Sequence, residues 1–161
     1  KLEAEAGFYA FNDVHAMMSF AATGRTDEVA RLRRAMRNAA KGKESNAAMT
    51  REVGLPLADG LASFAKKRYM EAIDDIDSVR DTANLFGGSH AQRDLLTLTL
   101  IDASIRAGDG RRAQHYIAER LMHKPTAWSE RLLMRSRRAE RASASAITGS
   151  TIASDQLAMQ S

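Results

Sequence analysis

A turn residue followed, after four intervening positions, by a small apolar residue recurs three times in this chain. A mostly apolar segment leads into each turn, and an amphipathic segment follows it, as in GRTDEVARLRRAM and GDGRRAQHYIAERL. One helical hairpin cannot bury its apolar face alone, so this repetition predicts an all-α fold of stacked antiparallel hairpins. The three pairs are Gly24 with Val29, Lys67 with Ala72, and Gly108 with Ala113.

The register of the turns places the helices along the chain. We expect one helical-repeat domain over residues 1–142, with a Ser- and Ala-rich tail that we expect to be flexible. The predicted hairpins cover about 12–42, 45–85 and 89–123, a capping helix covers about 126–142, and the tail covers 143–161.

Local signals refine these boundaries. Asn12 or Asp13 can cap the first helix. Gly54 and Pro56 fall inside the third predicted helix, where they predict a kink or a break. The run LLTLTLIDASI at 95–105 resembles a strand in composition, but its length and the repeat register favour a helix.

The second and third copies match the tetratricopeptide pattern best. Their spacing differs from it, because Gly24, Lys67 and Gly108 lie 43 and then 41 residues apart, against about 34 in that repeat. The extra residues must lengthen helices or loops. The matching positions are Tyr69, Ala72 and Ile76, then Gly108, Ala113, Ile117 and Pro125.

With this spacing, the strings FNDVHAMMSFAATGR, NAAMTREVGLPLADGLASF and GGSHAQRDLLTLTLIDAS resemble the C-terminal part of the tetratricopeptide repeat protein 38 family. The resemblance covers most of residues 11–125. It implies a right-handed superhelix of lengthened tetratricopeptide-like repeats and a missing N-terminal portion. It implies no reaction and no catalytic residues. The opening KLEAEAG, without an initiator Met, also suggests a piece of a longer chain.

Composition narrows the function classes. The chain has no Cys, which excludes disulfides and thiolate metal sites and agrees with a reducing, cytoplasmic location. No apolar run is long enough to cross a bilayer. The net charge of +4 comes with two basic clusters, which we interpret as solvated helix faces, because no aromatic residues interleave with them to stack bases. The clusters are Arg31, Arg33, Arg34, Arg37, Lys41 and Lys43, and Arg131, Arg135, Arg137, Arg138 and Arg141.

Several polar residues lie on faces of the first, third and fifth helices that should be apolar at about 100° per residue. In tetratricopeptide-type solenoids such leading helices line the concave surface, so these side chains could converge on a ligand or partner. Arginine would recognise an anion, and an imidazole titrates near neutrality. The candidates are His15, Asn46, Thr50, Arg51, His90, Arg93 and Asp94.

For this set we favour paired struts between stacked helices over a site, since buried polar groups must be paired. Ser89 and Gln92 form a capping box, and His90 and Asp94 can pair at i and i+4. His115 and His123 lie about 80° apart on their helix, and no third ligand completes a metal site. We expect no metal and no cofactor.

The sequence therefore predicts a scaffold that binds a peptide or protein partner through the concave face of its leading helices. The alternative is a small-molecule or catalytic pocket formed by the polar residues together with the missing N-terminal part, and no enzyme motif favours it. Nucleic acid binding through the basic clusters is a third, less favoured hypothesis. A homo-oligomer stays open, and we expect no membrane partner.

Overall fold

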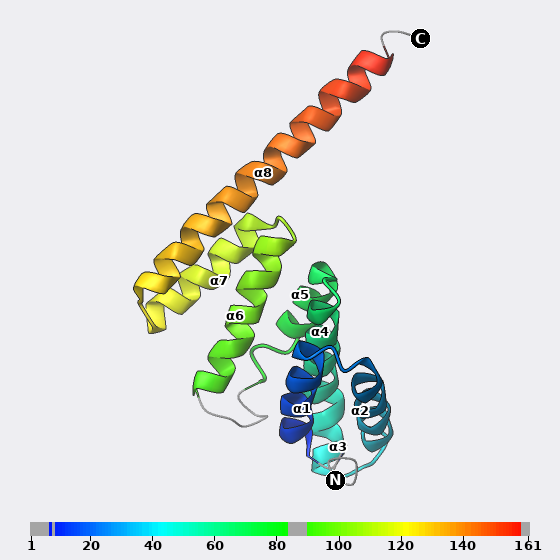
Figure 1. The fold of residues 1–161 in the computed structure, drawn as a ribbon. Coiled ribbons are helices and arrows are strands. Elements are labelled where there is room, and N and C mark those ends of the chain that lie inside the picture. Colours follow the sequence, from blue (N-terminus) through cyan, green and yellow to red (C-terminus); the bar gives the residue numbers. More distant parts are fainter. Residues whose placement is uncertain (1–6, 8, 84–89, 159–161) are drawn as a thin grey trace. The chain divides into compact units, whose positions relative to one another are not determined.

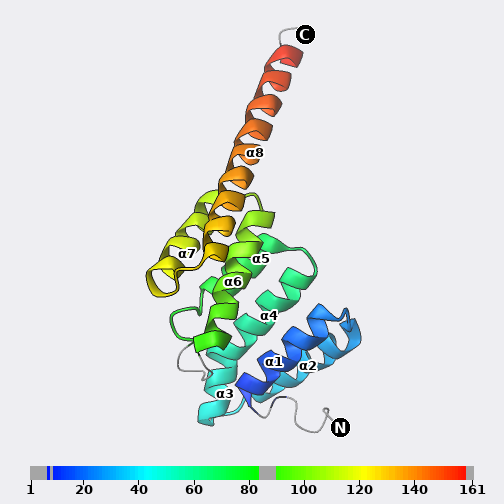
Figure 2. The ribbon, with the colours of Figure 1, turned by 60° about the vertical axis from the view of Figure 1, so that its left-hand side comes forward.

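The structure, a computed structural model, describes residues 7, 9–83 and 90–158, without the side chains of 90, 91 and 147–158. Within those ranges every regular element is a helix and there is no strand, which confirms the predicted all-α class. Contacts divide the chain into two compact units, residues 1–100 and 101–161. Figures 1 and 2 show the helices of each unit.

The three recurring turns have one and the same backbone geometry. Gly24, Lys67 and Gly108 all have positive φ, at 69°, 61° and 78°. The amide after each of them donates to the carbonyl five residues earlier, as in Arg25 to Phe20 at 2.9 Å. Such a left-handed residue with this bond is the Schellman motif that ends a helix. The same bond joins Arg68 to Ser63 and Asp109 to Ser104.

A new helix begins two residues after each turn, and its fourth residue is buried. Val29, Ala72 and Ala113 are 8%, 0% and 0% exposed. The predicted repeat is therefore confirmed in the turn and in the packing position that follows it. The turns connect α1 (Ala10–Ala22) to α2 (Thr26–Ala39), α4 (Leu55–Ala65) to α5 (Tyr69–Asp77), and α6 (His90–Arg106) to α7 (Gly110–His123).

The first unit contains two packed hairpins, α1 with α2 and α4 with α5, and α1 also packs against α4. Its core is made of apolar side chains with almost no exposure, which is the burial that stabilises stacked hairpins. They include Met17, Met36, Leu57, Ile73 and Ile76.

The third predicted helix is continuous at Gly54 and Pro56, where the sequence predicts a kink or a break. It consists of α3 (Ser45–Met49), a π-helical turn η2 (Thr50–Gly54) and α4. A proline ring inside a helix clashes with the carbonyl four residues earlier, here that of Glu52, and the wider π turn relieves this clash at Pro56. Gly54 also lets α1 approach, since a Cβ there would lie 3.2 Å from the Cβ of Ala10.

Two other local predictions need correction. Asp13 does not cap α1, because the helix already begins at Ala10 and Asp13 lies inside it. Helix α5 ends at Asp77, well before the expected end near residue 85. Residues 78–83 form i to i−3 turns instead, in which the hydroxyls of Ser78 and Thr82 donate to the carbonyls of Asp75 and Val79 at 2.7 and 3.0 Å.

The second unit contains the C-terminal part of α6, α7 and α8 (Ala127–Ala158). Helix α7 packs on α8 through Gly110, where an added Cβ would lie 2.8 Å from the amide nitrogen of Glu140. Helix α8 is longer than the predicted capping helix of 126–142 and continues into the segment 143–161. None of the helices in the described part of the chain is long and apolar enough to cross a membrane.

Candidate functional site

The first unit has a small open cavity beside α1. Its volume is about 20 Å³, which is room for about one water-sized molecule. Six of the nine residues that line it are apolar, and we call it the α1 cavity. They are Phe11, Val14, Met18, Leu57, Ala83 and Leu96, and the polar lining residues are His15, Gln92 and Arg93.

His15 is held in place from both sides of its ring. Nδ1 lies 2.8 Å from the carbonyl oxygen of Phe11, and Nε2 lies 3.1 Å from Nε2 of Gln92. The ring also lies beside that of Phe11, with centroids 4.3 Å apart. If Nδ1 carries the proton and donates to Phe11, then Nε2 accepts from the Gln92 amide. His15 therefore lines the cavity in a fixed orientation, with a partner at each of its two ring nitrogens.

The structure brings only two of the seven predicted site residues to this cavity, His15 and Arg93. Asp94 follows Arg93 in α6 and does not line the cavity, and the side chain of His90 lies outside the described residues. The capping box cannot be assessed, because Ser89 also lies outside them.

Two of the other three candidates, Asn46 and Arg51, serve the packing of the first unit. The amide oxygen of Asn46 accepts from the amide of Ala10 at 3.3 Å, at the start of α1. Arg51 donates to the carbonyl of Ala40 at 2.8 Å, just after α2, and lies 3.6 Å from Glu52. These contacts are those of struts between neighbouring helices. Arg51 also satisfies a carbonyl at a helix end, which such an end leaves without an intrahelical partner.

Thr50 is a different case, because its side chain is fully buried and its Oγ1 has no hydrogen-bond partner among the described residues. It lies in the π turn η2, between α3 and α4. The hydroxyl is therefore neither a strut nor part of the α1 cavity. Thr50 therefore forms no strut of the kind that Asn46 and Arg51 form.

Asp13 is a buried carboxyl that is not among the predicted site residues. It is 3% exposed, Oδ1 accepts from the amide of Gly7 at 2.9 Å, and Oδ2 has no partner within the described ranges. Burial raises the pKa of Asp13 because it disfavours the charged form, and the bond from Gly7 opposes that shift. The signal was present in the sequence, since Asp13 lies three residues from Ala10 and four from Met17 on one helical face.

The apolar lining of the cavity was not predicted either. Phe11 and Met18 share a face of α1 with His15 through helical spacing, but Ala83 follows the end of α5 and reaches the cavity only through the tertiary fold. No group of three or more His, Cys, Asp or Glu side chains in the described part of the chain could hold a metal ion.

No family model matches this chain, and no solved structure matches it. The fold and the side chains themselves therefore carry the functional argument.

Proposed function

We propose that this chain is a helical-repeat scaffold of the tetratricopeptide-like, right-handed kind, and that it binds a peptide or protein partner through its leading helices α1 and α4. The observation that carries this proposal is the α1 cavity. An apolar recess with a few polar groups at its edge is the form of many binding sites. Its half-buried lining residues Phe11 and Met18 lie on the leading helix of the first hairpin.

The size of the cavity favours a partner side chain over a substrate. Pockets for drug-sized ligands measure roughly 300–1,000 Å³, whereas the α1 cavity measures about 20 Å³. It suits the tip of one small apolar side chain, and the polar side chains of His15, Gln92 and Arg93 line the cavity beside the apolar ones. A catalytic pocket would need residues beyond those that line this cavity.

Filling the cavity tests this proposal. A peptide display library is selected on the wild-type chain, and the affinity of enriched peptides is measured by fluorescence anisotropy. Met18→Trp places a large side chain at the half-exposed edge of the cavity and should weaken these peptides at least 10-fold. Met70→Trp is the matched control, because Met70 is 46% exposed on α5 and does not line the cavity.

Both variants should keep the helical circular dichroism of the wild type. Equal affinity of the selected peptides for Met18→Trp and Met70→Trp would contradict binding at the α1 cavity. Failure to enrich any peptide on the wild type would remove the support for a peptide-binding scaffold.

A further inference from the structure

The net positive charge of the chain belongs to one of its two units. Residues 1–100 carry fourteen Lys and Arg and fourteen Asp and Glu, whereas residues 101–161 carry ten basic and six acidic residues. The first unit is therefore neutral, and the whole excess of +4 lies in the second. Such a charge asymmetry between two parts of a chain indicates a polyanionic partner for the basic part.

The two basic clusters differ in how many of their arginine side chains have an acidic partner. On α2, Arg31 lies 3.6 Å from Glu28, while Arg33 and Arg37 lie 2.5 and 3.7 Å from Asp59.

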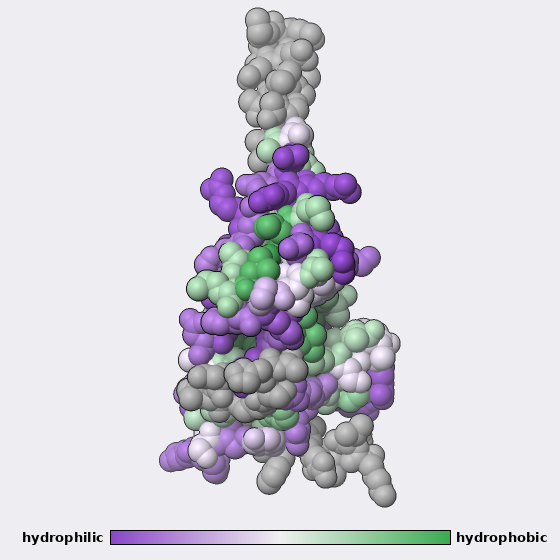
Figure 3. Space-filling model, turned by 90° about the vertical axis from the view of Figure 1, so that its left-hand side faces the viewer, coloured by the Kyte–Doolittle hydropathy of each residue, from purple (hydrophilic) through white to green (hydrophobic). Residues whose placement is uncertain are grey.

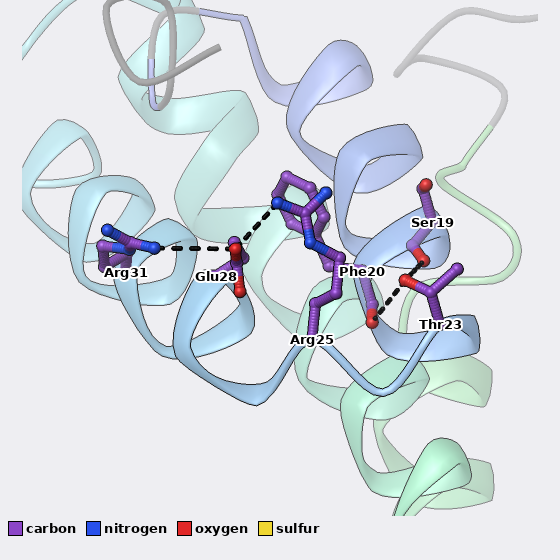
Figure 4. A network of polar contacts seen from close by, with 6 residues as sticks. All are labelled: Ser19, Phe20, Thr23, Arg25, Glu28 and Arg31. Atoms are coloured by element: carbon purple, nitrogen blue, oxygen red, sulfur yellow. Dashed lines mark hydrogen bonds and ion pairs between the residues drawn. The ribbon is translucent and has the colours of Figure 1, made fainter. Parts of the chain in front are cut away.

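At the start of α2, Arg25 donates to Glu28 at 2.7 Å and lies over the ring of Phe20, and this bond lowers the pKa of Glu28. Arg25, Glu28 and Arg31 form one chain of contacts, which Figure 4 shows beside the Thr23 hydroxyl and its bonds to the carbonyls of Ser19 and Phe20. Three of the six members of the α2 cluster, Arg31, Arg33 and Arg37, thus have a carboxylate partner.

On α8 most of the arginines have no such partner. Arg135 is paired with Asp102 at 3.3 Å. The side chains of the other four are exposed, and none of these guanidinium groups forms a hydrogen bond or ion pair with any described residue. Figure 3 shows mainly hydrophilic residues around α8 just below its grey end. We call these four residues, which are Arg131, Arg137, Arg138 and Arg141, the α8 arginine face.

The α8 arginine face is a narrow strip along one helix. At 100° per residue its members span an arc of about 120°, opposite the buried Ser129, Leu132 and Ser136. At 1.5 Å per residue the strip is about 15 Å long. The only large apolar side chain within it is Met134, which is 64% exposed.

We propose that the α8 arginine face binds the phosphate backbone of a nucleic acid duplex. Guanidinium groups bind phosphate oxygens bidentately, and arginines on both flanks of a helix reach both walls of a groove about 12 Å wide. The strip has no aromatic side chain to stack on exposed bases, so a duplex fits it better than a single strand.

Other partners fit the same strip less well. The centre of a protein interface is depleted of charge and needs apolar anchors, and Met134 alone does not supply them. An interfacial membrane helix needs a broad apolar face with Leu, Phe or Trp, which this strip lacks. A second copy of the chain offers a neutral first unit and a basic second unit, so it has no excess of negative charge to complement the strip.

The test is binding of the full chain to a 24-base-pair DNA duplex, measured by fluorescence anisotropy from about 50 to 200 mM salt. Four phosphate contacts predict a slope of log K against log salt of about −3.6, which is a loss of about 100-fold over that range. The variant R131Q/R137Q/R138Q/R141Q should lose at least 10-fold in affinity at 50 mM salt and most of the slope. An RNA duplex in parallel shows which backbone is preferred.

The control variant R31Q/R34Q/K41Q/K43Q removes the same charge from the exposed part of the α2 cluster and should keep most of the affinity and slope. Equal losses in both variants would overturn the proposal, since net charge alone would then account for binding. Absence of binding by the wild type at 50 mM salt would overturn it as well. So would stronger binding to a single strand, to polyglutamate or to anionic vesicles than to either duplex.

Discussion

The backbone amide of Arg68 donates to the carbonyl oxygen of Ser63 at 3.0 Å and closes the turn between α4 and α5. Between these two residues lies Lys67, whose φ of 61° is the only positive value of a residue other than glycine among the described residues. The turns at Gly24 and Gly108 make the same bond with a glycine in that position. The second repeat therefore keeps the same helix-ending turn, but with a residue whose side chain makes the left-handed backbone conformation unfavourable.

Replacing Lys67 by glycine should stabilise the first unit. The left-handed conformation destabilises a residue with a side chain by roughly 1–2 kcal/mol, and glycine removes this strain. Glycine also makes the unfolded chain more flexible, which offsets about 0.4–1 kcal/mol of the gain. We expect Lys67→Gly to raise the free energy of unfolding by about 0.5–1 kcal/mol in urea denaturation.

The reverse change at Gly24 is the control for Lys67. An added Cβ there meets nothing within 4 Å, so Gly24→Ala isolates the backbone effect. It should lower the free energy of unfolding by roughly 0.5–1 kcal/mol. A destabilised Lys67→Gly variant would mean that Lys67 contributes contacts that outweigh its strain.

The turns show why the all-α class and the ends of the helices at the three turns could be predicted from the sequence. A glycine before an amphipathic segment encodes a helix end locally, and the small residue after it encodes the packing of the next helix. Lys67 was placed in the same role by register alone, and its φ confirms the placement. Of the kink or break predicted at Gly54 and Pro56, the break is absent: the helix continues through the π turn η2, because one wide turn can relieve a proline clash within a helix.

The site could be predicted far less well, for a physical reason. Helical periodicity shows which residues share a face of one helix. It does not show which other helix packs against that face, or which hydrogen-bond partner each polar atom has in the folded chain. Asn46 and Arg51 lie on a leading helix as expected, yet their bonds go to the backbone at Ala10 and Ala40. The partners of His15 lie on its own helix and 77 residues away, and only the tertiary fold brings the distant one close.

Gly60 should not tolerate a methyl group. A Cβ there would lie 2.6 Å from Cγ1 of Ile76 and 3.2 Å from the carbonyl oxygen of Ala72, so α4 and α5 would have to separate. Such overpacking costs about 1–3 kcal/mol, against a helix-propensity gain of about 1 kcal/mol for alanine. We expect Gly60→Ala to lower the free energy of unfolding by up to about 2 kcal/mol.

A double-mutant cycle separates this clash from other effects. Ile76→Ala alone should cost about 2–5 kcal/mol because it leaves a cavity. Since it also removes the clashing atom, the double variant Gly60→Ala/Ile76→Ala should be more stable than the sum of the single effects by about 1 kcal/mol. Strict additivity would show that Gly60 does not serve the close approach of Ile76.

Asp13 should make stability fall as pH rises. Burial raises its folded-state pKa above 3.8, while the unfolded chain titrates near the ordinary value. Between these two values the folded state holds more protons than the unfolded state, so the free energy of unfolding decreases with rising pH and then stays lower. Other groups add their own pH dependence, so the measurement needs a matched variant.

Asp13→Asn removes the titration and keeps an oxygen that can accept from Gly7. The free energy of unfolding of the wild type minus that of the variant should decrease from about pH 3.5 to pH 7, measured by urea denaturation at several pH values. A difference that increases with pH would mean that the carboxylate is stabilised in the folded chain, contrary to its burial.

Arg120 should be the arginine on which the second unit depends most. It is 7% exposed, donates to the hydroxyl of Ser129 at 2.5 Å, and lies over the ring of Trp128 at 5.4 Å. A hydrogen bond of a charged group contributes about 1.5–3 kcal/mol and a cation–π contact about 0.5–1 kcal/mol. We expect Arg120→Ala to lower the free energy of unfolding by roughly 2–3 kcal/mol.

An exposed arginine of the α8 arginine face provides the control for Arg120. Arg138→Ala removes the same side chain from an exposed position without a partner in the described part of the chain, so it should change stability by less than about 0.5 kcal/mol. Trp128 is the only tryptophan, and its fluorescence reports unfolding of the second unit directly. An Arg120→Ala variant that unfolds with the same midpoint as Arg138→Ala would show that the contacts of Arg120 with Ser129 and Trp128 do not stabilise this unit.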